Sequence, residues 1–327
     1  MKMKAFQYEN SQKGLELREI PKPEAGSGQV QLQVKAAGMC HSDCHIVSGS
    51  SDAWLTKKPI TLGHEVAGII TEIGPGVTGF SLGDRVAVSQ VCHPVEERDW
   101  SLGIGLGFDG GYAQYAVAPV RRLMHIPGGV SFAQAAVATD ALATSYHAVV
   151  SEAGAKPGMT IGIVGLGGLG MSGLAFGALQ GAVMYGFDID KDKFEEATRL
   201  GASGCFKRLE LASDVALDAI VDFAGTGHTT ENALRVVKEG GKVVLVGLAA
   251  KTAVVPTELL VLRTVTLVGS LGASVDDLAQ VLKLLKEGLI DPMLVEVPFA
   301  EIPASIDALA KGGVKGRCWA DPSKVVE

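Results

Sequence analysis

Two patterns of hydrophobic and polar positions follow one another along the chain. In the first, short segments alternate the two kinds of residue, as where Val30, Leu32 and Val34 are separated by glutamines. A period of two is typical of a half-buried strand. Further strands of this kind are predicted at 66–77, 83–88 and 110–117. Many short strands joined by Gly/Pro turns predict a small barrel-like β domain.

From Ser131 onward, strands and helices alternate. Ser131 and Gln134 have the spacing of a capping box and predict a helix start. Buried strands are predicted at 160–164, 182–187, 219–223, 242–247 and 265–269, and helices at 171–180 and 274–288. This alternation predicts a doubly wound parallel sheet. Alternation returns at Val295, Val297 and Phe299, so we expect three segments: a catalytic domain at 1–142, a cofactor domain at 143–272, and a return to the catalytic domain at 273–327.

Composition narrows the class of protein. With 327 residues, 47% of them hydrophobic and 20% charged, the chain is typical of a well-buried globular enzyme. A net charge of -7 argues against nucleic-acid or membrane partners, which need a basic face. Neither a signal-peptide core nor an apolar run of membrane-spanning length is present, so we expect a cytoplasmic protein. Five cysteines, an odd number, fit a reducing compartment.

The segments 38–45 and 62–65 concentrate residues that bind metals. Cys40 and His64 offer a thiolate and an imidazole, the ligand types that zinc prefers, and carboxylates stand nearby. These two residues taken alone are equally compatible with a buried thiol and a hydrogen-bonded core histidine. The local density of Cys, His, Asp and Glu favours the metal site.

A glycine motif points to a dinucleotide. The pattern Gly165-x-Gly167-x-x-Gly170 follows a predicted strand, opens a predicted helix, and precedes Asp188 by 23 residues. Backbone N–H groups at the helix start can hold a pyrophosphate, and Asp188 can bind ribose hydroxyls while repelling a 2′-phosphate. NAD is therefore favoured over NADP. The alternative interpretation of the glycine motif is a plain strand-to-helix turn that binds no cofactor. The loop residues expected to bind the cofactor are Gly165, Gly167, Gly168, Leu169 and Gly170.

Together these motifs resemble the zinc-dependent medium-chain alcohol dehydrogenases, which combine a GroES-like catalytic domain with a Rossmann cofactor domain. The resemblance rests on Gly-x-Cys-His-Ser-Asp-x-His followed by Gly-His-Glu, and it covers essentially the whole chain. It implies an α/β fold, NAD and zinc as cofactors, and Cys40, His64 and Asp140 as the catalytic zinc ligands.

The resemblance also implies roles for neighbouring residues. Asp43 matches the carboxylate that supports the zinc-bound histidine, while Glu65 is expected behind the metal or as an alternate ligand. Ser42 and His45 match the proton relay from the bound alcohol to solvent.

Further residues of the resemblance concern the cofactor. His41 and Arg317 correspond to pyrophosphate contacts, and Lys193 is also expected to bind the cofactor. The residues expected near the nicotinamide are Thr144, Val246, Leu248 and Ser270.

The chain departs from the family pattern in one segment. A structural zinc, where present, is held by a Cys-x-x-Cys-x-x-Cys-x7-Cys lobe, expected here between about Val88 and Gly110. This segment has only Cys92 and His93 as soft ligands, too few for a four-ligand site. We therefore expect one catalytic zinc per chain, no structural zinc and a shortened lobe.

The resulting hypothesis is an NAD- and zinc-dependent oxidoreductase that interconverts primary or secondary alcohols and their carbonyl compounds by hydride transfer. One alternative is a polyol or quinone-type reductase of the same family, although quinone reductases lack the zinc ligands. Another is an inactive nucleotide-binding protein, which would be expected to lose Ser42 or His45. By analogy with the family, we expect a homo-oligomer, either a dimer or a tetramer.

Overall fold

The computed structural model describes residues 1–324, which form two compact units. Unit 1 consists of Met1–Ala141 together with the chain from Ala273 onward. Unit 2 consists of Leu142–Gly272.

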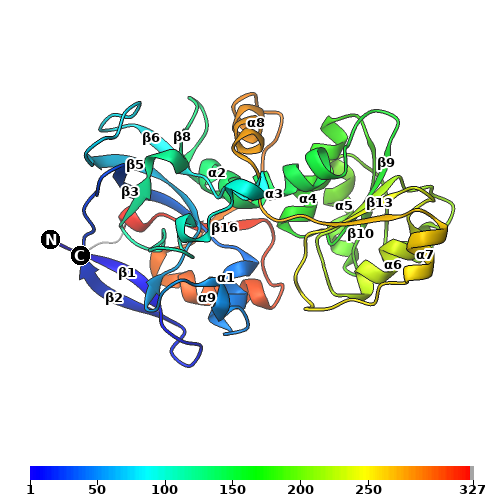
Figure 1. Ribbon diagram of the computed structural model, residues 1–327, viewed down its shortest axis with the longest axis horizontal. Helices are drawn as coiled ribbons and strands as arrows, with labels where there is room; N and C mark the ends of the chain where they lie inside the picture. The colour runs from blue at the N-terminus through cyan, green and yellow to red at the C-terminus, as the bar shows by residue number, and fades with distance from the viewer. Residues whose placement is uncertain (325–327) are drawn as a thin grey trace. The chain divides into compact units, whose positions relative to one another are not determined.

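Unit 1 is built on two β-sheets (Figure 1). A three-stranded sheet has the order β2-β1-β4, formed by Leu15–Pro21, Lys2–Tyr8 and Ile60–Thr61. A seven-stranded sheet has the order β15-β16-β3-β5-β6-β8, with β7 also pairing with β3. Its strands are β3 (Gln29–Gly38), β5 (Glu65–Ile73), β6 (Arg85–Val88), β7 (Tyr115–Pro119), β8 (Leu123–His125), β15 (Leu294–Glu296) and β16 (Arg317–Ala320). Strand β15 pairs in parallel with β16, and β16 pairs antiparallel with β3, so the C-terminal part of the chain joins the sheet of its first segment.

The strand expected at 110–117 is wrong in its first half. The backbone N–H groups of Gly110, Gly111 and Tyr112 donate to the carbonyls of Thr61, Gly63 and Leu62 instead of joining the ladder of β3. The strand begins only at Tyr115. These hydrogen bonds attach the segment to the residues just before His64.

Four α-helices belong to unit 1: α1 (His41–Val47), α2 (Phe132–Val137), α8 (Val275–Lys286) and α9 (Ile302–Ala310). The capping box predicted at Ser131 is confirmed at the start of α2, and α8 begins at the predicted Ser274, which also forms a capping box. Helix α1 was not predicted, because its N-cap is Cys40, a residue type that rarely caps helices. A π-helical turn, Ala138–Leu142, carries Asp140.

Unit 2 is a six-stranded parallel sheet flanked by helices, which confirms the doubly wound prediction (Figure 1). The strand order is β11-β10-β9-β12-β13-β14, formed by Ala202–Phe206, Val183–Phe187, Thr160–Val164, Ala219–Asp222, Lys242–Leu245 and Thr266–Gly269. Its helices are α3 (Ala143–Tyr146), α4 (Gly168–Leu179), α5 (Phe194–Arg199), α6 (His228–Val236) and α7 (Thr257–Leu262). Chain order reverses between β9 and β12, and sheets of this type bind ligands at the carboxyl ends of the strands beside such a reversal.

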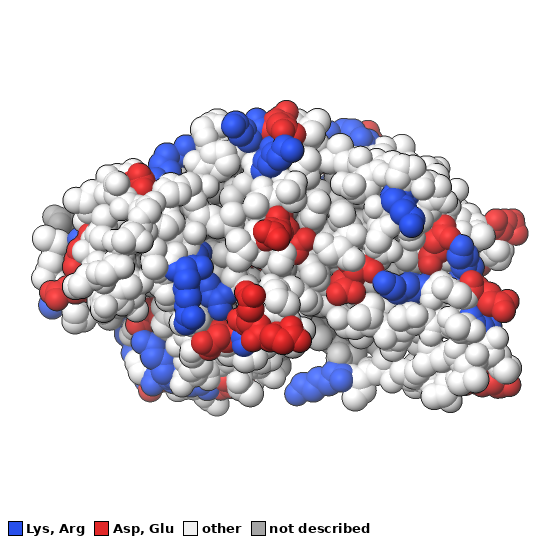
Figure 2. Space-filling model, turned by 45° about the horizontal axis from the view of Figure 1, so that its top comes forward, with Lys and Arg blue, Asp and Glu red and all other residues white. Residues whose placement is uncertain are grey.

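On the face drawn in Figure 2, basic and acidic side chains are interspersed within a larger uncharged area. Among residues 1–324, no helix has the length and apolar character needed to cross a bilayer.

Candidate functional site

Three predicted metal ligands come together in unit 1 from separate elements. Cys40 follows β3 and caps α1, His64 lies between β4 and β5, and Asp140 lies in the π-helical turn. One donor atom from each lies within 4.8 Å of the other two. The close pairing of β3 with β5, which places Gly38 opposite Glu65, brings the first two segments together.

The donors of this cluster fit a zinc ion. A sulfur, a ring nitrogen and a carboxylate oxygen are all ligand types of zinc, and three protein ligands are the set of a catalytic site that keeps a fourth position open. Cys40 is 6% and His64 3% exposed, whereas the side chain of Asp140 is 20% exposed. Solvent therefore reaches the cluster from the Asp140 side.

Charges around His64 prepare it for a cation. Its Nδ1 lies 3.4 Å from Asp43 Oδ1 and its Nε2 lies 3.5 Å from Asp140 Oδ2. Burial alone would disfavour the imidazolium, but these carboxylates hold the pKa of His64 well above its usual range. Burial likewise opposes ionisation of Asp140, yet His64 and Arg317 lower the pKa of Asp140 to about 2. A metal cation would thus replace a proton on His64, and binding should release that proton.

Glu65 and Arg317 form a buried ion pair beside the cluster. Arg317 Nη2 donates to Glu65 Oε1 at 2.5 Å, and the two side chains are 4% and 0% exposed. Burial raises the pKa of Glu65 to about 7, against the lowering effect of Arg317. Arg317 also interacts electrostatically with Cys40 and Asp140, so its charge offsets part of the negative charge of the cluster.

Helix α1 presents the two residues predicted to form the proton relay. Ser42 and His45 are three residues apart and therefore lie on the same side of the helix. Ser42 Oγ lies 3.7 Å from Cys40 Sγ, while the ring of His45 meets the ring of Trp54 edge-on, with centroids 6.2 Å apart. His41 is the first residue of the helix and is exposed.

The glycine loop of unit 2 lies between β9 and α4. A Cβ atom on Gly170 would lie 1.8 Å from the carbonyl oxygen of Gly165, so the turn itself requires this glycine. Gly167 differs, because a Cβ there would meet nothing within 4 Å and its φ of -84° suits any residue. The open space at Gly167 adjoins the N-terminus of α4, where a pyrophosphate would bind.

Asp188 ends β10 beside this loop. Its carboxylate accepts hydrogen bonds from the backbone of Leu166 at 2.8 Å and of Asp190 at 2.9 Å, and from Lys193 Nζ at 2.9 Å. The structure thus places Asp188 and Lys193 together beside the glycine loop. A carboxylate next to the loop fits the hydroxyls of an adenosine ribose.

The residues expected near the nicotinamide belong to other elements of unit 2. Val246 and Leu248 follow β13, Ser270 follows β14, and Thr144 lies on α3. Ser270 Oγ is buried and has no hydrogen-bond partner among the described residues, while Leu248 is 53% exposed. The first three positions lie at the carboxyl end of the sheet, the edge at which this type of sheet binds ligands.

Polar contacts hold the segment 88–110, in which the family pattern would place a structural zinc. Its short 3₁₀ turns are Val95–Glu97 and Trp100–Leu102. Arg98 Nε donates to the Cys92 carbonyl at 3.1 Å, and Asp99 accepts from the backbone of Ser101 at 3.0 Å.

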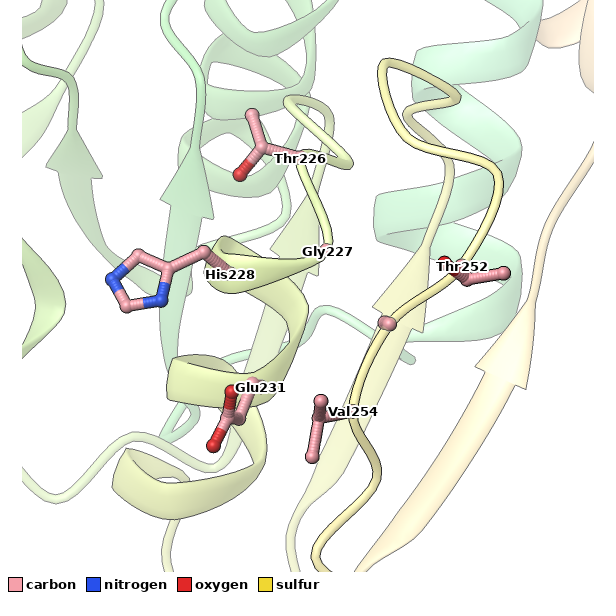
Figure 3. A pocket seen from close by; sticks show the side chains of 7 residues that line it. Thr226, Gly227, His228, Glu231, Thr252 and Val254 are labelled. Carbon is pink, nitrogen blue, oxygen red and sulfur yellow. The ribbon is translucent and has the colours of Figure 1, made fainter.

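A surface pocket of about 300 Å³ lies in unit 2, away from the glycine loop in sequence (Figure 3). Helix α6 contributes His228 and Glu231, and the chain after β13 contributes Thr252 and Val254. None of the predicted site residues lines this pocket, and we assign it no role.

Tyr112 is a residue of the metal site that the sequence analysis missed. Its hydroxyl donates to Asp43 Oδ2 at 2.8 Å, and the residue is fully buried. In the sequence, Tyr112 is one tyrosine in a strand-like segment, and a tyrosine in such a segment is more often a core residue than part of a site. The contact joins positions 69 residues apart, so spacing along the chain could not reveal it.

Comparison with known proteins identifies two family domains. Residues 26–128 match the alcohol dehydrogenase GroES-like domain, and residues 168–287 match the zinc-binding dehydrogenase domain. An alcohol dehydrogenase of Geobacillus stearothermophilus is 32% identical over 96% of this chain and 98% of its own. An NAD-dependent alcohol dehydrogenase of Sulfurisphaera tokodaii is 30% identical over 96% and 99%.

Solved structures agree with this similarity. The acetophenone reductase of Geotrichum candidum, solved in complex with NAD, superposes with a TM-score of 0.89 and 30% identity, covering 99% of this chain and 98% of the reductase. The similarity therefore covers the residues of unit 1 and those of unit 2.

Proposed function

We propose that this chain interconverts alcohols and carbonyl compounds with NAD and zinc. The chain belongs to the medium-chain dehydrogenase/reductase family of alcohol dehydrogenases. The observation that carries the proposal is the cluster of Cys40, His64 and Asp140, whose donor atoms lie within 4.8 Å of one another. Conservation of the fold alone would not imply this chemistry, since one fold serves many functions.

The metal cluster and the dinucleotide loop have separate tasks in this proposal. A bound zinc ion acts as a Lewis acid on the substrate oxygen, and NAD supplies the hydride acceptor. Cys40, His64 and Asp140 hold the ion, and Asp43 orients His64 through Nδ1. Glu65 and Arg317 form a buried ion pair beside these ligands.

Proton transfer is the task of α1. Ser42, beside the Cys40 thiol, receives the proton of the substrate hydroxyl, and His45 passes it toward solvent. In carbonyl reduction the same two residues deliver the proton to the substrate oxygen.

Cofactor binding is the task of unit 2, and the family resemblance adds His41 and Arg317 of unit 1 to the residues for the pyrophosphate. The loop Gly165–Gly170 holds the pyrophosphate at the start of α4, and Asp188 with Lys193 binds the adenosine ribose. His41 and Arg317 add positive or polar groups for the pyrophosphate. Thr144, Val246, Leu248 and Ser270 surround the nicotinamide.

Several finer features belong to the same proposal. The chain binds one zinc ion and lacks a structural zinc, because the segment 88–110 offers a single cysteine. Substrates are small primary or secondary alcohols and their aldehydes or ketones. Residues 1–142 and 273–327 form the catalytic domain and 143–272 the cofactor domain of a cytoplasmic homo-oligomer.

Metal content and turnover test the proposal together. Elemental analysis of the purified protein should find close to one zinc per chain. NAD reduction should be followed with a panel of alcohols, before and after chelation and after zinc is added back. Activity that is lost with the metal and restored by zinc supports the assignment.

Two results would contradict it. Two zinc ions per chain would contradict the single catalytic zinc of the proposal. Turnover by zinc-free protein would move the chain to the zinc-independent reductases of the family.

A further inference from the structure

We infer that Tyr112 is a positioning residue of the metal centre, which acts through Asp43 on the ligand His64. The inference rests on the proposed metal site and extends it to a residue that lies behind Asp43. It is carried by hydrogen bonds and close contacts that tie Tyr112 to both segments that supply ligands.

Asp43 divides its two oxygens between different partners. Its Oδ2 accepts from the Tyr112 hydroxyl at 2.8 Å and from the backbone N–H of Cys40 at 3.0 Å. Its Oδ1 faces His64 Nδ1 at 3.4 Å. Neither Asp43 Oδ1 nor His64 Nδ1 has another hydrogen-bond partner in the part of the chain that the structure describes. With two donors on Oδ2, the other oxygen is left for the histidine.

The tyrosine hydroxyl has one proton and two acceptors within reach. The carbonyl of Gly38 lies at 3.2 Å and the Asp43 carboxylate at 2.8 Å. A charged acceptor at the shorter distance forms the stronger hydrogen bond, so the proton points to Asp43. Burial, with the charge of Asp43, raises the pKa of Tyr112 well above its usual range, which keeps the hydroxyl a donor.

The ring of Tyr112 also contacts the chain just before His64. Gly63 has a φ of +92°, and a Cβ on it would lie 2.6 Å from Tyr112 Cδ1. The Tyr112 backbone N–H donates to the carbonyl of Leu62 at 2.9 Å. The same residue thus packs against the backbone that carries His64 and fixes the carboxylate that faces its imidazole.

This arrangement predicts what the hydroxyl contributes. Without it, the Asp43 carboxylate keeps only the Cys40 N–H on Oδ2 and can rotate away from His64. The imidazole then loses the partner that sets its orientation. Losing such an indirect partner typically weakens metal binding about 10- to 100-fold, and we expect about tenfold for Tyr112→Phe.

The test measures zinc affinity of the full chain by competition with a chromophoric chelator, for wild type, Tyr112→Phe and a control. Phenylalanine keeps the ring against Gly63 and removes only the hydroxyl. The matched control is Tyr8→Phe, because Tyr8 is equally buried and donates its hydroxyl to a carboxylate, Asp52, at 2.6 Å. We expect Tyr112→Phe to bind zinc about tenfold more weakly and Tyr8→Phe to bind it as wild type does.

A double-mutant cycle separates positioning from general stability. If Tyr112 acts through Asp43, the substitution Tyr112→Phe has little further effect on zinc affinity in an Asp43→Asn background. The melting temperature of each metal-free variant is measured alongside, and a fall in it would indicate that the substitution lowers the stability of the fold.

The outcomes distinguish this inference from the proposed function. Wild type that binds zinc while Tyr112→Phe binds it equally well overturns the role of Tyr112 alone. So does a tenfold loss that persists in the Asp43→Asn background, or one that Tyr8→Phe reproduces. Wild type without zinc affinity overturns the metal centre itself, and the role of Tyr112 with it.

Discussion

At the scale of single residues, identity matters less than the element on which a residue lies. Cys40 and Cys44 are both cysteines of one short segment, yet only Cys40 belongs to the metal cluster. Cys44 Sγ instead faces the carbonyl of Ile306 at 3.4 Å. The four-residue spacing on α1 separates a ligand at the N-cap from a packing residue one turn later.

This contrast makes a matched pair of substitutions. Cys40→Ser should weaken zinc binding at least about 100-fold and remove NAD-linked activity, because the hydroxyl is a far poorer ligand than a thiolate. Cys44→Ser should keep both, since serine can still donate to the Ile306 carbonyl. Elemental analysis and alcohol-dependent NAD reduction check the pair, and equal zinc loss in both variants would contradict the ligand assignment.

A second residue-scale prediction concerns the pH dependence of a thiol outside the metal site. Burial raises the pKa of Cys205 above its ordinary value. Because the thiolate is the reactive form, a raised pKa lowers reactivity at neutral pH, and the rate climbs about tenfold per pH unit until the pKa is reached. Alkylation of the native protein by iodoacetamide, mapped by mass spectrometry, should therefore keep rising from pH 7 to pH 9. A plateau below pH 9 would contradict the raised pKa.

At the scale of elements, the turn from β9 to α4 contains glycines with different requirements. Gly170 is required by the fold, since any side chain would meet the Gly165 carbonyl. Gly167 has no such neighbour and no unusual backbone angle. The fold therefore does not require glycine at position 167, and in the proposed function the pyrophosphate does.

Alanine substitutions separate the two requirements. Gly167→Ala should change the free energy of unfolding by less than about 1 kcal/mol, the scale of a changed N-cap. It should weaken NAD binding about tenfold, or about 1.4 kcal/mol, by pushing the pyrophosphate away from the backbone. Gly170→Ala should instead destabilise the fold by about 1–3 kcal/mol or more. Urea denaturation and calorimetric titration with NAD check both, and unchanged NAD affinity in Gly167→Ala would refute the cradle.

At the scale of the whole molecule, the two units carry different ligand sites. The three proposed metal ligands belong to unit 1, and the glycine loop with Asp188 belongs to unit 2. A ligand that binds only the folded form stabilises it by mass action, and does so most where its own contacts lie.

Metal removal should therefore act locally first. At zinc concentrations of about 100 times Kd, loading should add about 2.7 kcal/mol of stability, and chelation should reverse the gain. Hydrogen exchange should slow on loading in α1 and in the segment before β5, with much less change in α4. Calorimetry and exchange mass spectrometry check this, and equal slowing in both units would contradict a site confined to unit 1.

The sequence by itself determined the fold class and the main elements. Period-two alternation predicted β3, a capping box predicted the start of α2, and the glycine motif with Asp188 predicted the dinucleotide loop. These signals are local, because a strand, a cap or a strand–loop–helix turn is defined within a few residues. Cys40 and His64 also stood out locally, by the density of metal-binding residues around them.

Only the tertiary structure decided how distant residues meet. Asp140 was named from family resemblance alone, and its position in a π-helical turn next to Cys40 and His64 depends on the packed sheet. The buried pair of Glu65 with Arg317 and the hydrogen bond of Tyr112 to Asp43 join positions 252 and 69 residues apart. No local pattern encodes such contacts, because burial and the pairing of β3 with β5 and β16 create them.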